Sequence, residues 1–550
     1  MADNKLYYGD NLHILRQYIP DESVDLIYLD PPFNSNQNYN VLFKEENGTA
    51  SAAQVHAFTD TWKWNDTSEE ALNDITENAP SRLVELIKGF LAFLGRNQFT
   101  AYLVMMAPRL LELHRVLKPT GSIYLHCDPT ASHYLKLIMD QIFDVRNFQN
   151  EIIWKRSYAH SDTKQGRKGY GNLTDIILYY AKGSEFIFNT QYRPNSQEYI
   201  KNFYKYMDSD GRRYRLVDTT GPGGAAKGNP HYEVMGVWRY WRYSQEKMNK
   251  LIAEGRIIQT KPGNVPQFKQ YLDDMPGVPL QNLWDDINPI SSMAKERLGY
   301  PTQKPEALLE RIVQASSNEG DIILDPFCGC GTTIVASEKL NRRWIGIDIT
   351  HLAIALMKSR LQDTFGDSAK YDVIGEPTDL SGAHALARQD RYQFQWWALS
   401  LVKARPVDQN QKKGADKGID GIKYINITPG LKKPQTIKVV VQVKSGHVQV
   451  KDVREFKTVI ENTKSEMGLF VTLDEPTAPM TQEALSSGYY KPSGIVGAIS
   501  CPKVQILTIE ELLNGKKVQY PMHDDVTFRR AGKVEDEEAK NLEIDFSKDS

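Results

Sequence analysis

A short apolar run that ends in an acid and two prolines constrains this chain most. Residues 24–29 (VDLIYL) have the composition of a buried strand, and they are followed directly by Asp30, Pro31, Pro32 and Phe33. Open α/β sheets bind ligands at the carboxyl ends of their strands, which is where these four residues would lie. Each proline fixes its own φ and restricts the residue before it, so Asp30 and the Pro31 carbonyl would be held beside the Phe33 ring. Two acceptors beside an aromatic face suit a planar ring with an exocyclic amine; the plainer alternative is a proline turn that only ends a strand.

A glycine-rich loop follows a second run of this kind. Residues 321–333 (DIILDPFCGCGTT) read as a strand ending at Asp325 and a loop that opens a helix, where Gly329 and Gly331 let the backbone approach a ligand. The loop lacks the Gly-Lys-Ser/Thr ending of a phosphate loop and is not GxGxxG. Asp348 ends the next strand about 20 residues later, where an acid would grip ribose hydroxyls. The pattern predicts a nucleoside-type cofactor.

Composition indicates an ordinary intracellular globular protein. The 550 residues suggest three or four domains, and 41% hydrophobic residues suffice for their cores. Without a signal pattern or an apolar run of 18 residues, we expect a cytoplasmic protein with no membrane association. Cys328 and Cys330 are expected to be small loop fillers, because two cysteines one residue apart make a poor metal site. Residues 5–10 (KLYYGD) read as a further strand ending in an acid, Asp10, and as a neighbour of the strand before Asp30.

One segment carries a surplus of positive charge. Residues 151–270 hold 20 Lys or Arg against 11 Asp or Glu, interleaved with aromatics, whereas residues 531–550 hold seven acids against three bases. Such a mixture can contact phosphates and stack on bases; the alternative is a solvated strand face with ordinary packing aromatics. The predicted DNA contacts are Lys164, Arg167, Lys168, Arg212, Arg213, Arg215, Arg239 and Arg242.

Taken together, the motifs DPPF, DPFCGCG and YPTQKP resemble those of the permuted β class of DNA amino-methyltransferases, over about residues 1–362. The resemblance implies an α/β, Rossmann-like, doubly wound sheet, S-adenosyl-L-methionine as cofactor, and double-stranded DNA as partner. It implies catalytic roles for Asp30, Pro31, Pro32 and Phe33, which would hold a flipped base. The implied cofactor-binding residues are Asp10, Thr302, Gln303, Lys304, Asp325, Phe327, Cys328, Gly329, Gly331 and Asp348. The leading Asp of DPPF favours adenine N6, with cytosine N4 as the alternative, and His126 would either touch the base or be structural.

The carboxyl-terminal third is similar to the Mrr-type PD-(D/E)XK nucleases, over about residues 386–516. That similarity assigns Asp420, Gln442 and Lys444 to a nuclease site in which Asp420 would hold Mg²⁺. One position departs from the pattern, because Gln395 stands where a helix glutamate is expected. The alternative is therefore a nuclease-like fold kept only for DNA binding or partner contacts.

These assignments predict the following domain order: a catalytic half, 1–156; a basic target-recognition region with a hairpin, 157–290; a cofactor-binding half, 291–365; a linker, 366–385; a nuclease-like domain, 386–516; and an acidic tail, 517–550. The function expected from them is sequence-specific DNA methylation in a restriction-modification or anti-phage context. A DNA-binding scaffold with a decayed methyltransferase, and an RNA or small-molecule methyltransferase, are the rivals. A restriction or defence subunit and a homodimer both remain open as partners.

Overall fold

The computed structural model describes residues 3–32, 64–158, 168, 170–291, 294, 296–298, 302–407, 418–427, 435–492, 500–521 and 524–525. The chain divides into two compact units, and each is considered by itself. The first contains residues 1–189 and 282–550, and the second contains residues 190–281.

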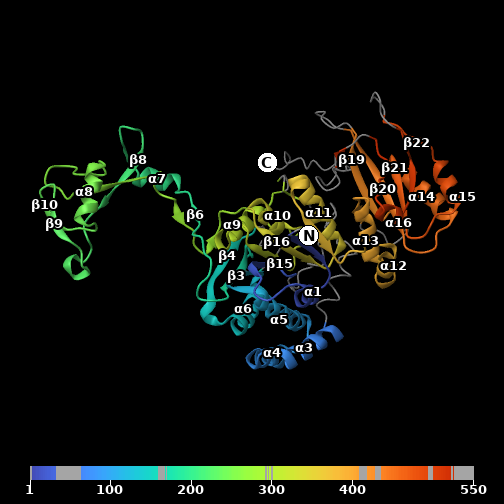
Figure 1. Ribbon diagram of the computed structural model, residues 1–550, viewed down its shortest axis with the longest axis horizontal. Coiled ribbons are helices and arrows are strands. Elements are labelled where there is room, and N and C mark those ends of the chain that lie inside the picture. The colour runs from blue at the N-terminus through green and yellow to red at the C-terminus, as the bar shows by residue number, and fades with distance from the viewer. Residues whose placement is uncertain are drawn as a thin grey trace, which may run out of the picture. The chain divides into compact units, whose positions relative to one another are not determined.

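A nine-stranded sheet forms the centre of the first unit (Figure 1). Its strand order is β14-β4-β5-β3-β2-β15-β16-β1-β17, and β5 alone runs antiparallel to its neighbours. The strands are β1 (Asn4–Tyr8), β2 (Val24–Leu29), β3 (Leu117–Cys127), β4 (Phe148–Lys155), β5 (Thr174–Ala181), β14 (Leu283–Trp284), β15 (Ile322–Asp325), β16 (Arg343–Asp348) and β17 (Tyr371–Ile374). Every residue of β2 is buried, as expected for a parallel strand covered on both faces.

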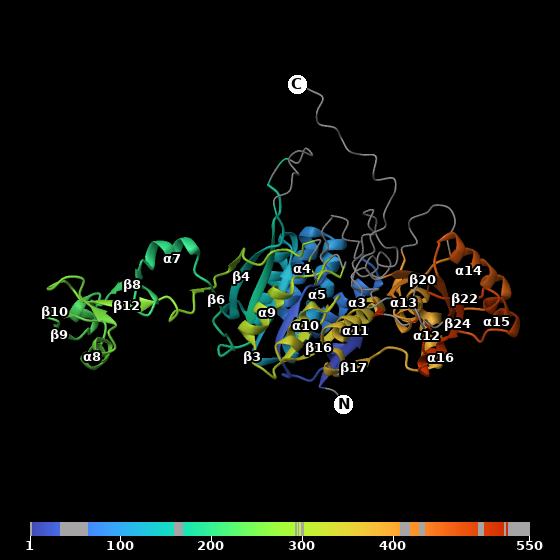
Figure 2. The ribbon, with the colours of Figure 1, turned by 90° about the horizontal axis from the view of Figure 1, so that it is seen from above.

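Helices cover both faces of this sheet (Figure 2). One face packs against α1 (Asn11–Tyr18), α3 (Asp66–Asn78), α4 (Ser81–Leu94), α5 (Gln98–Val116) and α6 (Pro129–Phe143). The other packs against α9 (Glu306–Ser316), α10 (Thr332–Lys339) and α11 (His351–Phe365). Local sequence sets where helices begin, because the Asp10 side chain caps α1 and Asn97 forms a capping box with Thr100 at α5.

The position of β1 corrects one expectation from the sequence. We expected β1 and β2 to be neighbours, but β15 and β16 lie between them. The two strands of the glycine-loop half, although some 300 residues later in the chain, enter the middle of the sheet. The acid that follows β1 is therefore separated from Asp30 by the two strands that carry Asp325 and Asp348.

A second sheet lies in the carboxyl-terminal part of the first unit, with order β18-β19-β20-β21-β24 and β25 beside β19. Its strands are β18 (Arg405–Pro406), β19 (Gly421–Asn426), β20 (Thr436–Lys444), β21 (Met467–Thr472), β24 (Val504–Thr508) and β25 (Asp524–Asp525); β22 (Tyr489–Tyr490) pairs separately with β23 (Cys501–Pro502). One face packs on α12 (Leu380–Gln389), α13 (Arg391–Leu401) and α16 (Ile509–Leu513), and the other on α14 (Val450–Asn462) and α15 (Ala478–Leu485).

The segment expected to be a linker, 366–385, is structured instead. β17 within it is the edge strand of the nine-stranded sheet, and α12 begins before it ends and packs on the second sheet. Helix α13 also contacts α11, and the Gln393 side chain accepts a hydrogen bond from the backbone N–H of His351 (3.4 Å). The polar composition of the segment concealed a short edge strand, which needs only one apolar face.

The second unit is built from small sheets. Its elements are β6 (Tyr192–Arg193), α7 (Gln197–Phe203), β7 (Tyr206–Met207), β8 (Arg213–Asp218), β9 (His231–Val234), β10 (Val237–Tyr240), α8 (Gln245–Ala253), β11 (Ile257–Ile258), β12 (Gln267–Tyr271) and β13 (Val278–Pro279). This unit is shorter than the predicted region 157–290. The predicted hairpin, β4 with β5, belongs to the nine-stranded sheet because β5 also pairs with β3.

Within the described ranges, no helix is both long enough and apolar enough to span a membrane.

Candidate functional site

Asp30 lies at the carboxyl end of β2 and contacts a lysine from a distant motif. Its Oδ2 is paired with the ammonium of Lys304, and both side chains are largely buried. The resemblance implies a cofactor-binding role for Lys304; here its ammonium pairs with the predicted catalytic carboxylate. Pro31 is buried, whereas Phe33 lies outside the described residues. The pair thus joins the DPPF motif to the YPTQKP motif across 274 residues.

Asp325 ends β15, the strand directly beside β2. Its Oδ1 accepts from the backbone N–H of Phe327 (3.0 Å), and its Oδ2 accepts from the hydroxyl of Thr333 (2.5 Å). The side chain is buried, and this burial raises the pKa of Asp325 to about 7; the charges of Asp30 and Asp348 act in the same direction, and the two hydrogen bonds oppose them. Asp325 therefore holds both the start and the end of the glycine loop through these two hydrogen bonds.

Asp348 ends β16 and holds the loop from the other side. Its Oδ2 accepts from the N–H of Gly329 (2.9 Å), and its Oδ1 accepts from the N–H and the hydroxyl of Thr350 (2.9 Å each). Burial raises the pKa of Asp348. Gly331 has φ +73°, and a Cβ there would lie 2.5 Å from Met357, so only glycine fits.

Two buried arginines support this site, and sequence reasoning missed both. Arg109 donates to Asn11 Oδ1 (2.7 Å) and to Asp10 Oδ2 (2.6 Å), while Asn11 donates to the carbonyl of Pro326 at the start of the loop (2.9 Å). Asp10, the predicted adenine contact, is thus tied to the loop. Neither Arg109 nor Asn11 belongs to a recognisable motif, so only the fold reveals them.

The second arginine, Arg360 on α11, binds the other end of the loop. It donates to the carbonyl of Cys330 (3.0 Å) and to the Thr332 hydroxyl (3.2 Å), and it pairs with Glu306 at the start of α9 (2.9 Å). Cys328 and Cys330 are both buried, and the Cys328 thiol faces the carbonyl of Ile347. This placement agrees with the small-filler interpretation of the cysteines.

A buried polar chain runs beside Asp30. The Tyr28 hydroxyl lies 2.9 Å from His126 Nδ1, His126 Nε2 lies 3.1 Å from Asp175 Oδ2, and Arg156 lies 3.3 Å from the other oxygen of Asp175. His126 is completely buried, which supports the structural alternative for it over contact with a base. Burial raises the pKa of the Tyr28 phenol well above its ordinary value, and the Asp30 carboxylate adds to the effect.

The remaining residues of the YPTQKP motif have backbone roles. Gln303 accepts from the N–H of Leu298 (2.9 Å) and donates to the carbonyl of Glu296 (2.5 Å), and the Thr302 carbonyl lies 3.5 Å from the Lys304 ammonium. The predicted contacts of Thr302 and Gln303 with a cofactor stay predictions.

The nuclease-like site contains one acid and two amides. Asp420, just before β19, accepts from Gln395 Nε2 on α13 (2.9 Å) and from the N–H of Val443 (2.6 Å). The Oε1 atom of Gln442 is buried and has no hydrogen-bond partner among the described residues, and Lys444 lies 3.7 Å from Asp452. Gln395 thus occupies the place expected for a helix glutamate and touches the predicted metal ligand.

These donors are a sparse set for a metal ion. Mg²⁺ takes oxygen ligands and is usually held by one or two carboxylates together with water and substrate phosphates. Asp420 supplies one carboxylate and Gln442 one amide oxygen, so the residues fit a weakly held Mg²⁺. Over the part of the chain that the structure describes, no cluster of three or more His, Cys, Asp or Glu could hold a metal ion.

The predicted DNA contacts in the second unit differ in their availability. Arg212 is paired with Asp273 and Asp274 and lies over the Tyr271 ring, and Arg215 donates to Gln270 and the Tyr199 hydroxyl. Asp273 and Asp274 lie just beyond the basic segment 151–270, so the charge count of that segment left out the two acids that pair with Arg212. The exposed arginines are Arg213, Arg239 and Arg242; Lys168 is exposed in the first unit, and Lys164 and Arg167 lie outside the described residues.

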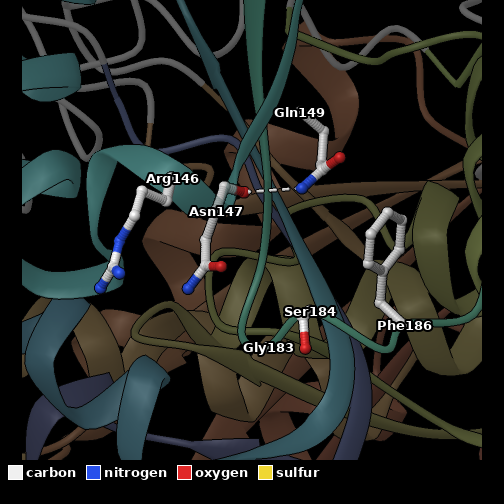
Figure 3. A pocket seen from close by; sticks show the side chains of 6 residues that line it. All are labelled: Arg146, Asn147, Gln149, Gly183, Ser184 and Phe186. Atoms are coloured by element: carbon white, nitrogen blue, oxygen red, sulfur yellow. Dashed lines mark hydrogen bonds between the residues drawn. The ribbon is translucent and has the colours of Figure 1, made fainter.

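A surface hollow lies on the first unit (Figure 3). It is lined by Arg146, Asn147, Gln149, Gly183, Ser184 and Phe186, and Gln149 donates to the Asn147 carbonyl (3.1 Å). These residues precede or begin β4 and follow β5, at the edge of the sheet where the other strands start. The hollow therefore lies at the opposite end of the strands from the end that carries Asp30.

A doubly wound sheet with acids at three strand ends and a glycine loop held by two of them defines a methyltransferase of the nucleoside-cofactor class. The chain belongs to the DNA methylase family, whose model matches residues 24–359, and its cofactor is S-adenosylmethionine. Residues 386–492 match a second model, described as restriction endonuclease.

Three curated relatives agree with this family assignment. The chain is 30% identical over 361 residues to Type II methyltransferase M.EcaI of Enterobacter cloacae, covering 65% of this chain and 69% of the relative. It is 28% identical over 391 residues to the Type III restriction-modification enzyme StyLTI Mod subunit of Salmonella typhimurium, covering 68% and 56%. It is also 27% identical over 356 residues to DNA adenine methyltransferase YhdJ of Escherichia coli, covering 65% and 82%.

Proposed function

We propose that this DNA methylase transfers its methyl group to N6 of adenine within a specific DNA sequence, as the modifying enzyme of a restriction-modification system. The observation that carries the proposal is the position of Asp30, at the end of β2 and beside the strand whose end opens the glycine loop. The leading Asp of the DPPF motif favours adenine. One of the relatives described above is named an adenine methyltransferase, and another is a subunit of a restriction-modification enzyme.

The residues at the strand ends fit the cofactor. Asp348 Oδ1 accepts two hydrogen bonds from Thr350, whereas Oδ2 accepts one from Gly329, so Oδ2 keeps a lone pair that could accept from a ribose hydroxyl. Ile349, next to it, is 43% exposed and offers an apolar face to a purine. Asp30 and Asp348 lie close enough to Asp325 to raise its pKa, so acidic groups gather at these strand ends, which suits a cation. S-adenosylmethionine, when bound, supplies a methyl group on a positively charged sulfonium.

The chain's own residues would act on the base. The Asp30 carboxylate and the Pro31 carbonyl accept the two hydrogens of the exocyclic amine, which turns its lone pair toward the methyl group and holds it in line. Lys304, by pairing with Asp30, limits the rotation of this carboxylate. Asp30 also holds the proton that the amine must lose once the new carbon–nitrogen bond has formed. The polar chain of Tyr28, His126, Asp175 and Arg156 supports the structure beside Asp30.

Methylation-sensitive long-read sequencing tests the target base. Cells without other DNA methyltransferases would express either the intact chain or its Asp30→Ala variant, and their genomes would be compared. We expect N6-methyladenine at one short sequence with the intact chain and none with the variant. N4-methylcytosine at that sequence, or no modified base, would contradict adenine specificity.

A second candidate activity is DNA cleavage by the carboxyl-terminal domain. It is favoured by the contact of Asp420 with Gln395, at the edge of a sheet whose next strand carries Gln442 and Lys444. Asp420 and Gln442 would hold Mg²⁺, and Lys444 would stabilise charge on the attacked phosphate. Incubating supercoiled plasmid with the purified full chain and Mg²⁺ or Mn²⁺, with and without prior methylation, tests this activity. No cleavage of either plasmid would leave the domain with a binding role.

A further inference from the structure

A short hairpin in the second unit presents an unusual surface. β9 and β10 are joined by Met235 and Gly236, whose φ values of 48° and 81° are those of a tight two-residue hairpin turn. The pairs run from Val234 opposite Val237 to His231 opposite Tyr240. This geometry fixes which side chains share a face, because alternate residues of a strand point to opposite sides.

One face of the hairpin is firmly anchored. Tyr232 and Val234 are buried in a small core with Trp241, which follows β10 directly. The Trp241 indole donates to the Tyr232 carbonyl (2.8 Å), and the Tyr232 hydroxyl donates to the carbonyl of Tyr243 (2.8 Å). The hairpin is thus held rigidly by one set of its aromatic residues, and these cannot contact a partner.

The opposite face exposes a second set of aromatic rings. Trp238 is 62% exposed and Tyr240 is 37% exposed, and the ring of His231 lies 5.7 Å and 4.5 Å from theirs. Burying a tryptophan stabilises a protein by more than burying most other side chains, so a rigid strand that leaves one in water is typical of a binding surface. The aromatic residues of the stretch WRYWRY look alike in the sequence, but the fold buries Trp241 as an anchor and leaves Trp238 and Tyr240 exposed.

Charge around this face indicates which part of a nucleic acid it fits. Glu233 lies directly opposite Trp238 and is exposed, and a carboxylate there would be repelled by phosphates. Arg242, which follows β10 shortly after Tyr240, supplies an exposed positive charge near this face, whereas Arg239 points to the opposite face of the hairpin together with Tyr232. Residues 219–261 as a whole hold seven Lys or Arg against three Asp or Glu. The aromatic face suits bases, and its margins suit the backbone.

We propose that the exposed face of the β9–β10 hairpin contacts base pairs in a groove of duplex DNA, with Trp238 and Tyr240 against the bases and Arg242 on a flanking phosphate. This inference rests on the proposed function and assigns part of its DNA recognition. A two-stranded ribbon has the width that the major groove admits, and Glu233 there would accept from a cytosine amine. Aromatic contact of this kind depends little on salt, whereas arginine–phosphate contact depends on it strongly.

The test compares single substitutions in the full chain. Binding to a fluorescein-labelled duplex of mixed sequence, and to one of its single strands, would be measured by anisotropy at several salt concentrations for the wild type, Trp238→Ala, Arg242→Ala and Phe93→Ala. Phe93, which is 64% exposed on α4, is the matched control. We expect Trp238→Ala to weaken duplex binding about 10-fold or more with an unchanged salt slope, Arg242→Ala to lower the slope by about one, and Phe93→Ala to change neither.

Several outcomes would overturn the inference: Trp238→Ala within twofold of wild type, a loss equal to that of Phe93→Ala, or a loss seen only with single-stranded DNA. If Trp238→Ala does not fold, Trp238→Phe and Trp238→Leu decide, because both keep apolar bulk and only Phe keeps a ring. Equal affinity of these two contradicts a specific contact of an aromatic ring with the bases. Transfer of labelled methyl groups to DNA is measured in the same samples. Failure of the wild type to methylate overturns the proposed function, whereas normal methylation with unchanged binding by Trp238→Ala overturns only the hairpin assignment.

Discussion

The two candidate catalytic centres of this chain are both built at strand ends, but they differ in how their acids are supported. In the methyltransferase sheet, Asp30, Asp325 and Asp348 end strands and each is held by a lysine, a hydroxyl or backbone N–H groups. In the nuclease-like sheet, Asp420 is the corresponding acid and its partners are an amide side chain and one backbone N–H.

This difference follows from the charge that each centre has to hold. A sulfonium cofactor brings one positive charge and needs no direct ligands, so a group of acids held apart at neighbouring strand ends can serve it. A divalent ion needs its ligands at fixed short distances, and a lone carboxylate beside a neutral glutamine holds it weakly. The first centre is organised before its ligand arrives, whereas the second would depend on the phosphates of DNA to complete its site.

The largest effect is expected from Asp30→Ala. Methyl transfer should fall about 10²–10³-fold or more, because an acceptor aimed at the reacting amine is lost. Cofactor affinity should stay within a fewfold of wild type, since Asp30 acts on the base. Single-turnover transfer and isothermal titration with S-adenosylmethionine measure the two effects, with Asp21→Ala, an exposed acid near β2, as the control. A variant that transfers methyl groups at the wild-type rate would remove Asp30 from the mechanism.

The Asp420→Ala substitution tests the other side of the comparison. If the nuclease-like domain cleaves DNA in Mg²⁺, cleavage should fall about 10²-fold or more, because the carboxylate predicted to hold the metal ion is removed. Methylation should be unchanged. Plasmid nicking and methyl transfer are measured on the same preparation, with the exposed Glu455→Ala on α14 as the control. Loss of methylation as well would show that the contact between α11 and α13 couples the two centres.

The raised pKa of Asp325 predicts a pH dependence of stability. Because the carboxyl group has a higher pKa when folded than when unfolded, its protonated form stabilises the fold fully below pH about 4, and this contribution is lost as pH rises through about 7. Wild type should therefore lose about 2 kcal/mol relative to Asp325→Asn between pH 5.5 and 7.5. Urea unfolding of both chains at the two pH values measures the difference. If the difference in free energy of unfolding between the two chains is the same at pH 5.5 and pH 7.5, Asp325 is ionised in the folded protein over this whole range.

The smallest effect is expected from adding a charge to the weaker centre. Gln395→Glu would place a second carboxylate next to Asp420, and Mg²⁺ affinity should rise about tenfold, since the charge of the ligands governs the affinity of such sites. Calorimetric titration with Mg²⁺ in the presence of uncleaved duplex compares the variant with wild type. Gln393→Glu, two positions away on the same helix, is the control. An unchanged affinity would mean that Gln395 does not face the metal position.

Much of the fold could be predicted from local pattern. The strands before Asp30, Asp325 and Asp348, the helices α1, α4 and α5, and the pairing of β4 with β5 all follow from apolar periodicity and turn residues. Less of the site could be predicted. The acids at the strand ends could be found from the sequence, but the residues that support the glycine loop could not. Arg109 and Arg360 are single buried polar residues within helices, and neither belongs to a motif.

The sequence by itself determined where the chemistry lies along the chain. Two prolines after an acid and glycines with positive φ are local requirements, so they can be recognised without knowing the fold. Only the tertiary structure decided which of these residues meet. In the fold, β15 and β16 lie between β1 and β2, and Lys304 pairs with Asp30. Arg212 pairs with two aspartates, and Trp238 is exposed whereas Trp241 is buried. Such contacts join residues that local pattern cannot relate, because they depend on the packing of whole elements and not on the spacing within one.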